Sequence, residues 1–359
     1  MHYVESPHRL PYEMASGILQ AEIGCSYNRC RFCSLCRKPG KDYRPAPREE
    51  VEADLDELAS YVRRPSRIYL YGGNPFGMPR DILIPLLERI HEKLPEVKTI
   101  GGFCRVADVK AATDEDLATW ARLGVQGLSI GAESAYDPAL KFMRKPHTAA
   151  DLEQQCARLD KVGIDYTLFY LAGMAGAEKC SEAARASAEV FSRINPLRIN
   201  IMTLTVFDNA DLAQDVASGT FIPAAEREIV LEIRDFIAGL SGCTSFIEAG
   251  HDTNMVHFDG VLPRDQEKMA LYLEQRAEIM SEEHMRFLRS RVRTLEQKCM
   301  IRRGACVRPR ASGSARPIKM LGFSARHPIS PAFGLAAASL LLSCQAHEWP
   351  YQGRFSLKH

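Results

Sequence analysis

The sequence predicts an α/β protein with a parallel sheet, either doubly wound or curled into a barrel. Two observations support this prediction. Short apolar segments alternate with helical patterns from residue 16 to about 205, and only short loops join them. Parallel strands need right-handed helical crossovers, so such an alternation builds a parallel sheet. The 359 residues, 46% of them hydrophobic, suffice for one barrel-sized domain or two ordinary ones.

Six apolar segments are the expected strands. The segment RIYLY runs directly into Gly72 and Gly73, and DYTLFYLAG ends in glycine. Ligands bind at the carboxyl ends of the strands in such sheets, so a site is expected at these ends. The expected strands are 18–23, 67–71, 97–103, 126–130, 165–173 and 197–204.

The expected helices carry apolar residues that recur every three or four positions. In the clearest one, Thr148 stands at an N-cap position, Asp151 follows three residues on, and Gly163 provides the stop. Pro85 limits where the second helix begins. The expected helices are 48–62, 82–90, 113–123, 148–163 and 181–194, followed by 224–240 and 263–298.

The composition divides the chain into four expected segments. The first 299 residues hold 37 Lys and Arg against 44 Asp and Glu, whereas the last sixty hold nine Lys and Arg and one acid, Glu348. The acidic body argues against a nucleic-acid partner. The tail is rich in Arg, Pro and Ser without periodicity, so low order is expected there. The segments are a lead-in at 1–15, a core at 16–210, a helical extension at 211–299 and a basic tail at 300–359.

No membrane attachment is expected. The N-terminus, MHYVESPHRL, has charges and prolines instead of the apolar core of a signal peptide, and no apolar run approaches the roughly 18 residues of a membrane span. We therefore expect a cytoplasmic protein. Clustered cysteines in that compartment serve metal or redox chemistry more often than disulfides.

Four thiols stand within GCSYNRCRFCSLC, namely Cys25, Cys30, Cys33 and Cys36. A structural zinc site commonly takes two ligand pairs separated by a dozen or more residues, and this loop lacks that separation. An iron–sulfur cluster is larger, and three cysteines of one loop can hold it while one iron stays open to a substrate. The spacing favours the cluster, and zinc stays open as the alternative.

This loop, at the end of the first expected strand, resembles the cysteine loop of the radical S-adenosylmethionine (SAM) superfamily. Members hold a [4Fe–4S] cluster by three cysteines, most often as C-x3-C-x2-C with an aromatic residue before the last one. Here Cys25, Cys30 and Cys33 match, with the spacing C-x4-C-x2-C, and Phe32 is the aromatic residue. The resemblance implies that these three cysteines bind the cluster and that Cys36 does not.

The end of the second expected strand is also similar to the superfamily. Gly72, Gly73, Asn74 and Pro75 resemble its Gly-Gly-Glu segment, where backbone groups bind the amino group of SAM. Glycine permits the close backbone approach that this contact needs. A valine at Gly73 is therefore expected to weaken SAM binding and to leave the cluster in place.

The fourth expected strand, GLSIGAES, resembles the superfamily segment that would place Ile130 near the adenine and Glu133 at polar atoms of SAM. The stretches ALKFMRKPHTAADL and VGIDYTLFYLAG look like the branch that contains oxygen-independent coproporphyrinogen oxidase and uncharacterised relatives. The resemblance covers about residues 16–275 and does not reach the tail.

The resemblance implies a partial (β/α)6 TIM-like barrel with a C-terminal helical extension. It also implies an enzyme that uses a [4Fe–4S] cluster to cleave SAM to a 5′-deoxyadenosyl radical, which abstracts hydrogen from a small-molecule substrate. An electron donor such as flavodoxin or ferredoxin is the implied partner. The alternative is a non-catalytic zinc- or iron-binding protein that uses the loop structurally.

Three further residues are candidates for a substrate or metal role. Cys104 stands at the end of the third expected strand, and His251 and His257 follow the expected barrel. His147, just before a helix N-cap, is expected to be structural.

Overall fold

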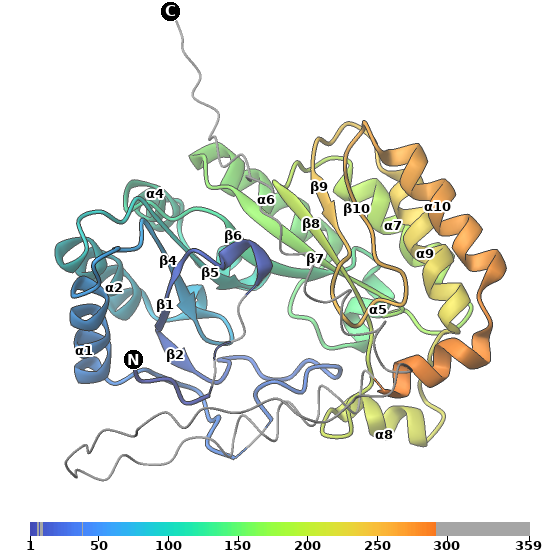
Figure 1. The fold of residues 1–359 in the computed structure, drawn as a ribbon, viewed down its shortest axis with the longest axis horizontal. Helices are drawn as coiled ribbons and strands as arrows, with labels where there is room; N and C mark the ends of the chain where they lie inside the picture. The colour runs from blue at the N-terminus through green and yellow to red at the C-terminus, as the bar shows by residue number, and fades with distance from the viewer. Residues whose placement is uncertain (6, 8–9, 38, 292–359) are drawn as a thin grey trace, which may run out of the picture. The chain divides into compact units, whose positions relative to one another are not determined.

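The computed structural model describes residues 1–5, 7, 10–37 and 39–291, so the predictions for the tail lie outside the described residues. Its centre is an eight-stranded sheet in the order β1-β4-β5-β6-β7-β8-β9-β10 (Figure 1). Neighbouring strands run parallel, except for the antiparallel pair β9 and β10. The strands are β1 (Gly17–Gln20), β4 (Arg67–Tyr71), β5 (Thr99–Cys104), β6 (Leu128–Glu133), β7 (Tyr166–Ala172), β8 (Arg198–Thr203), β9 (Phe246–Glu248) and β10 (Asp259–Val261).

The six strands that the alternation predicts are confirmed, and the fold is α/β as expected. The short strands β9 and β10 were not predicted. Strands β1 and β10 are the two edges of the sheet in the described part of the chain, which agrees with a partial barrel. A separate antiparallel pair, β2 (Glu22–Ile23) and β3 (Arg44–Pro45), brackets the cysteine-rich segment.

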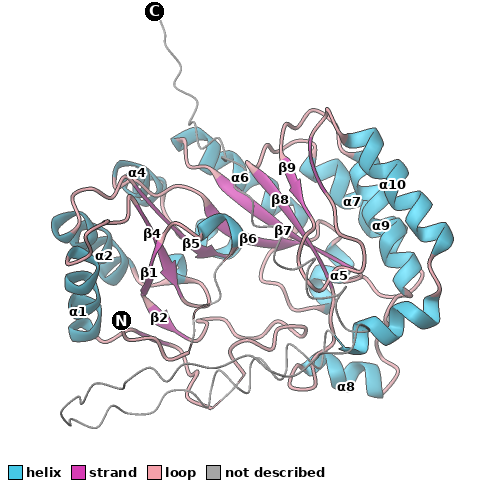
Figure 2. Ribbon diagram, viewed as in Figure 1, coloured by secondary structure: helices cyan, strands magenta, loops and turns pink. Residues whose placement is uncertain are grey.

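Helices flank the sheet on its outer side (Figure 2), and apolar side chains of strands and helices form one main core. Helices α7 and α10 both pack on α9. No helix among the described residues combines the length and the apolar character that a membrane crossing requires. The helices are α1 (Arg48–Ala59), α2 (Arg80–Lys93), α3 (Val106–Ala111), α4 (Asp114–Arg122), α5 (Asp137–Phe142), α6 (Ala149–Val162), α7 (Cys180–Phe191), α8 (Asp211–Ala217), α9 (Glu226–Gly239) and α10 (Gln266–Ile279), with short 3-10 turns η1 (Pro11–Glu13) and η2 (Pro75–Gly77).

The ends of α6 confirm the sequence prediction in detail. The Thr148 side chain accepts a hydrogen bond from the Asp151 N–H, and Gly163 closes the helix in a left-handed conformation with φ of 74°. Pro85 lies inside α2, which begins five residues before it. The helix therefore starts earlier than the sequence indicates.

The long helix predicted at 263–298 is wrong within the described residues. Helix α10 ends at Ile279, Met280 is extended with ψ of 127°, and a second helix runs from 282 to 291. The break lets Glu282 accept hydrogen bonds from the backbone N–H groups of Glu226 and Arg227 at the start of α9. These bonds satisfy N–H groups that a helix start leaves without partners.

The amino edge of the sheet, where β4 and β8 begin, is called the floor below. The turn η1 contributes Glu13, whose carboxylate is 2% exposed and accepts two hydrogen bonds from Arg67, at 2.9 and 2.7 Å. Arg198 pairs with Glu248 at 2.6 Å and lies over the Tyr12 ring. The floor is thus closed by charges that neutralise one another.

Candidate functional site

The segment between β2 and β3, residues 24–43, follows the carboxyl end of β1 and is called the cysteine loop below. Cys25, Cys30, Cys33 and Cys36 are free thiols, and each is partly buried. Burial raises the pKa of Cys33 to about 11, and the neighbouring thiols Cys30 and Cys25 add to the rise. Burial likewise raises the pKa of Cys36 to about 12, with further contributions from Cys33 and Cys25. All four thiols therefore lie in one electrostatic neighbourhood.

Cys33 and Cys25 are electrostatic neighbours of Cys36, so the structure does not set Cys36 apart from the predicted ligands. The choice of Cys25, Cys30 and Cys33 as the ligands remains a prediction. Within the described ranges, no three or more His, Cys, Asp or Glu side chains lie close enough to hold a single metal ion.

The glycines at the end of β4 are required by the packing of the cysteine loop itself. A Cβ at Gly73 would lie 2.4 Å from the Gly24 carbonyl oxygen and 2.5 Å from Cys25 Cβ. A Cβ at Gly72 would lie 2.3 Å from Glu22 Cγ. The expectation that a valine at Gly73 leaves the cluster in place must therefore be revised, because that side chain would displace the first predicted ligand.

Asn74 is fully buried and ties this edge to the cysteine loop. Its Oδ1 accepts from the Ser26 N–H at 3.0 Å, and its Nδ2 donates to Ser26 Oγ at 2.8 Å. Asp108 lies 3.3 Å from the same Nδ2 and pairs with Arg105, which donates to Ser26 Oγ at 3.3 Å. These contacts fix the residue that follows Cys25.

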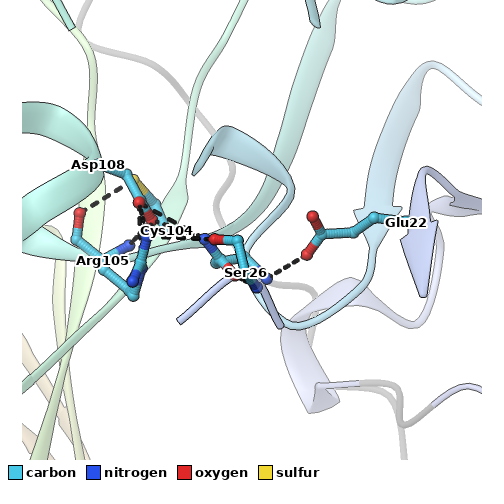
Figure 3. A network of polar contacts seen from close by, with 6 residues as sticks. Glu22, Ser26, Cys104, Arg105 and Asp108 are labelled. Atoms are coloured by element: carbon cyan, nitrogen blue, oxygen red, sulfur yellow. Dashed lines mark hydrogen bonds and ion pairs between the residues drawn. The ribbon is translucent and has the colours of Figure 1, made fainter. Parts of the chain in front are cut away.

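Glu22 lies at the end of this network opposite to Arg105 and Asp108 (Figure 3). Its Oε1 accepts from the Asn74 N–H at 2.6 Å, while its Oε2 is buried without a hydrogen-bond partner. Burial raises the pKa of Glu22 to about 7, although the Asn74 N–H opposes the rise. A buried oxygen without a partner is costly, and it marks an acceptor that a ligand cation or N–H group can fill.

Glu133 ends β6 in the left-handed region, with φ of 66°. This backbone is unfavourable for a residue with a side chain. Its carboxylate lies 3.2 Å from the Lys145 ammonium, which also donates to the Gly131 carbonyl at 2.9 Å. Burial lowers the pKa of Lys145, but Glu133 and Cys30 outweigh it and leave the pKa above its ordinary value.

Lys145 was missed by the sequence prediction. Its side chain is only 4% exposed, and Cys30 and Cys33 are among its electrostatic neighbours. It therefore brings a buried positive charge to the thiols. The sequence did contain a signal for Lys145, because this residue lies in ALKFMRKPHTAADL, a stretch that resembles one branch of the superfamily.

The remaining predicted site residues lie in different surroundings. Pro75 is buried at the start of η2, and Phe32 is half-buried against a second apolar cluster that includes Leu204 and Phe221. Ile130 is 2% exposed and belongs to the main core. Its proposed contact with adenine stays a prediction.

The three further candidates, Cys104, His251 and His257, differ in burial. Cys104 is buried at the end of β5, and burial raises its pKa well above the ordinary value. His251 and His257 are exposed on the connection between β9 and β10, and His251 Nδ1 bonds to Thr253 Oγ1 at 2.9 Å. His147 is buried against the Ala132 carbonyl, as a structural residue would be.

Comparison with known proteins gives one family match. Residues 23–179 match the family described as the Radical SAM superfamily. That range contains the cysteine loop, the end of β4 and the Glu133–Lys145 pair. No curated protein matches the chain.

Several solved structures are similar to this one. The radical S-adenosylmethionine methyltransferase TsrM from Kitasatospora setae is 18% identical over 57% of this chain and 39% of its own, with a TM-score of 0.48. Elp3 from Methanocaldococcus infernus is 15% identical over 73% and 63%, at 0.46. Coproporphyrinogen III oxidase (HemN) from Escherichia coli is 15% identical over 66% and 53%, at 0.47. The chain thus spans about two-fifths of the length of TsrM.

Proposed function

Residues 23–179 form a radical SAM domain, and from this premise we propose an enzyme that cleaves SAM to a 5′-deoxyadenosyl radical for hydrogen abstraction from a small-molecule substrate. The superfamily uses a [4Fe–4S] cluster and SAM for this chemistry. The observation that carries the proposal is the group of four thiols on one loop, beside the end of β4 and the Glu133–Lys145 pair. Such a donor set fits an iron–sulfur cluster, because soft thiolates are its usual ligands.

Cys25, Cys30 and Cys33 are the proposed cluster ligands. When bound, a reduced cluster supplies the electron that cleaves the sulfonium of SAM. The Lys145 ammonium lies close enough to Cys30 and Cys33 to offset the negative charge of their thiolates. Ser26, held by Asn74, fixes the backbone next to the first ligand.

SAM is proposed to bind along the same edge, at Gly72, Gly73, Asn74, Pro75 and Glu133. The Asn74 side chain is occupied by Ser26 and Asp108 and its N–H by Glu22, so its contribution to SAM would come through the backbone carbonyl.

Two carboxylates support this placement of SAM. Glu22 Oε2 is an acceptor without a partner at the end of β4, where the amino group of SAM is expected. Glu133 is half of an ion pair that could be shared with a zwitterionic ligand. The adenine contact of Ile130 is proposed with its backbone only, since its side chain belongs to the core.

Anaerobic reconstitution with iron and sulfide tests the proposal. We expect about four irons and four acid-labile sulfides per chain, with a brown colour. SAM should then yield methionine and 5′-deoxyadenosine on reduction, with flavodoxin or ferredoxin as the proposed physiological electron donor. One zinc per chain, without colour and without SAM cleavage, would instead support the structural alternative.

A further inference from the structure

Helix α8 lies against the middle of the cysteine loop, although about 180 residues of sequence separate them (Figure 1). It follows β8 and lies beyond residue 179, so it is outside the matched domain. Nothing in the proposed chemistry requires it. Several contacts nevertheless join α8 to the loop, and most of them involve Arg31, which follows Cys30, and Arg37, which follows Cys36.

Both backbone polar groups of Arg31, which follows Cys30, form hydrogen bonds. Its N–H donates to the Met143 carbonyl at 3.0 Å, and its carbonyl accepts from the Leu212 N–H of α8 at 2.9 Å. Its guanidinium Nη1 lies 2.6 Å from both carboxylate oxygens of Asp215. This pair is shielded from solvent, with side chains 23% and 14% exposed, so it is stronger than a typical surface ion pair.

Arg37, next to Cys36, makes the second contact. Its guanidinium pairs with Asp211 at the start of α8 and donates to the Cys30 carbonyl at 2.9 Å. The Asn209 amide donates to the Ser34 carbonyl at 3.1 Å. Four residues just before and within α8, namely Asn209, Asp211, Leu212 and Asp215, thereby bind the loop from Arg31 to Arg37.

We propose that α8 is a clasp that sets the shape of the loop from Cys30 to Arg37 before iron arrives, with Asp215 and Asp211 as its positioning residues. The proposal rests on the proposed function, since the loop is taken to be the cluster site. The clasp already fixes the backbone from Cys30 to Arg37, so cluster binding does not have to order this part of the chain. The clasp also slows the escape of iron, because release requires the loop to open.

Hydrogen exchange of the apoprotein tests the clasp without any cluster. Asp215→Asn keeps the shape of the side chain and removes its charge. We expect the amides of Arg31 and Leu212 to exchange about tenfold faster in this variant, as loss of a charge-assisted hydrogen bond predicts. The melting temperature of the apoprotein should fall by no more than a few degrees, which shows that the fold is kept. Unaltered exchange would overturn the proposal.

Iron release to a chelator from the reconstituted protein tests the consequence. We expect about tenfold faster release from Asp215→Asn and near-normal release from Asp215→Glu, which keeps the charge. Glu52→Gln is the matched control, because Glu52 forms a similar paired contact with Arg89 far from the loop, at 27% and 38% exposure. Normal release from Asp215→Asn, or equal acceleration in Glu52→Gln, would overturn the proposal.

The two experiments also distinguish a failure of this proposal from a failure of the proposed function. A wild-type protein that takes up no iron would defeat the cluster assignment. The exchange rates of Arg31 and Leu212 would still decide whether α8 holds the loop.

Discussion

The floor and the carboxyl edge of the sheet each contain a buried glutamate, and the two glutamates differ in their hydrogen-bond partners. Glu13 and Glu22 are 2% and 0% exposed. At the floor, Arg67 binds both carboxylate oxygens of Glu13. At the carboxyl edge, Glu22 has one oxygen bonded to a backbone N–H and the other without a partner. The two glutamates are thus equally buried, but only Glu13 has hydrogen-bond partners for both of its carboxylate oxygens.

This difference indicates which end serves stability and which end serves a ligand. A paired buried charge holds elements together and has no remaining capacity for a substrate. A buried acceptor without a partner costs free energy in the folded protein, and such a cost is typical of functional sites. The thiols and Lys145 lie at the second end, as this reasoning requires.

The largest effect is expected from the thiols. Alanine at Cys25, Cys30 or Cys33 should abolish SAM cleavage and remove most bound iron, whereas Cys36→Ala should keep both. A fourth thiolate would close the iron site that SAM needs. Iron content and 5′-deoxyadenosine formation measure the two outcomes. An active Cys25→Ala beside an inactive Cys36→Ala would show that the ligand trio is wrong.

The second effect comes from Gly73→Val. The new side chain would collide with the Gly24 carbonyl and with Cys25, so most iron should be lost together with SAM binding. Gly250→Val is the control, because a Cβ there meets nothing within 4 Å. Iron per chain after reconstitution is the measurement. A Gly73→Val protein that keeps its iron would mean that the loop can move away from β4.

At the floor, Glu13→Gln should reduce stability and leave chemistry alone. The substitution leaves Arg67 buried without its carboxylate, and we expect a loss of about 3 kcal/mol in the free energy of unfolding. SAM cleavage per folded molecule should not change. Urea unfolding and the cleavage rate provide the two readouts. A cleavage rate that falls as much as stability does would contradict the division between floor and carboxyl edge.

The sequence predicted the six parallel strands and the cysteine loop because both are local. Apolar segments such as 67–71 mark a strand without reference to the rest of the chain, and thiol spacing is read within one loop. The strands β9 and β10 have three residues each and depend on pairing, so they have little local signal.

The partners within the site could not be predicted for a related reason. Glu133, which pairs with Lys145, adopts a left-handed backbone, and no residue pattern indicates that conformation at a glutamate. Asp215 meets Arg31 across 184 residues of sequence. The position of Asn74 in a motif did not indicate that its side chain holds Ser26.

The smallest effect concerns the pH dependence of stability, and it tests the buried carboxylate of Glu22 directly. Burial raises the pKa of Glu22 to about 7, above the ordinary value of 4.5. Between these values the folded protein binds a proton that the unfolded chain has released, so stability must fall as pH rises from 4.5 to 7. We expect Glu22 to contribute about 2 kcal/mol to this fall.

Urea unfolding at pH 5 and pH 7.5 measures the fall, and Glu22→Gln should reduce it. Glu232 is the matched comparison, because burial raises its pKa to about 7 as well, while both of its oxygens are bonded, to the Tyr170 hydroxyl and the Gly173 N–H. SAM should therefore restore stability at pH 7.5 in the wild type and in Glu232→Gln, but less in Glu22→Gln, if Glu22 Oε2 is the acceptor for its amino group. Equal stabilisation of all three proteins would show that the unpaired oxygen plays no part in binding SAM.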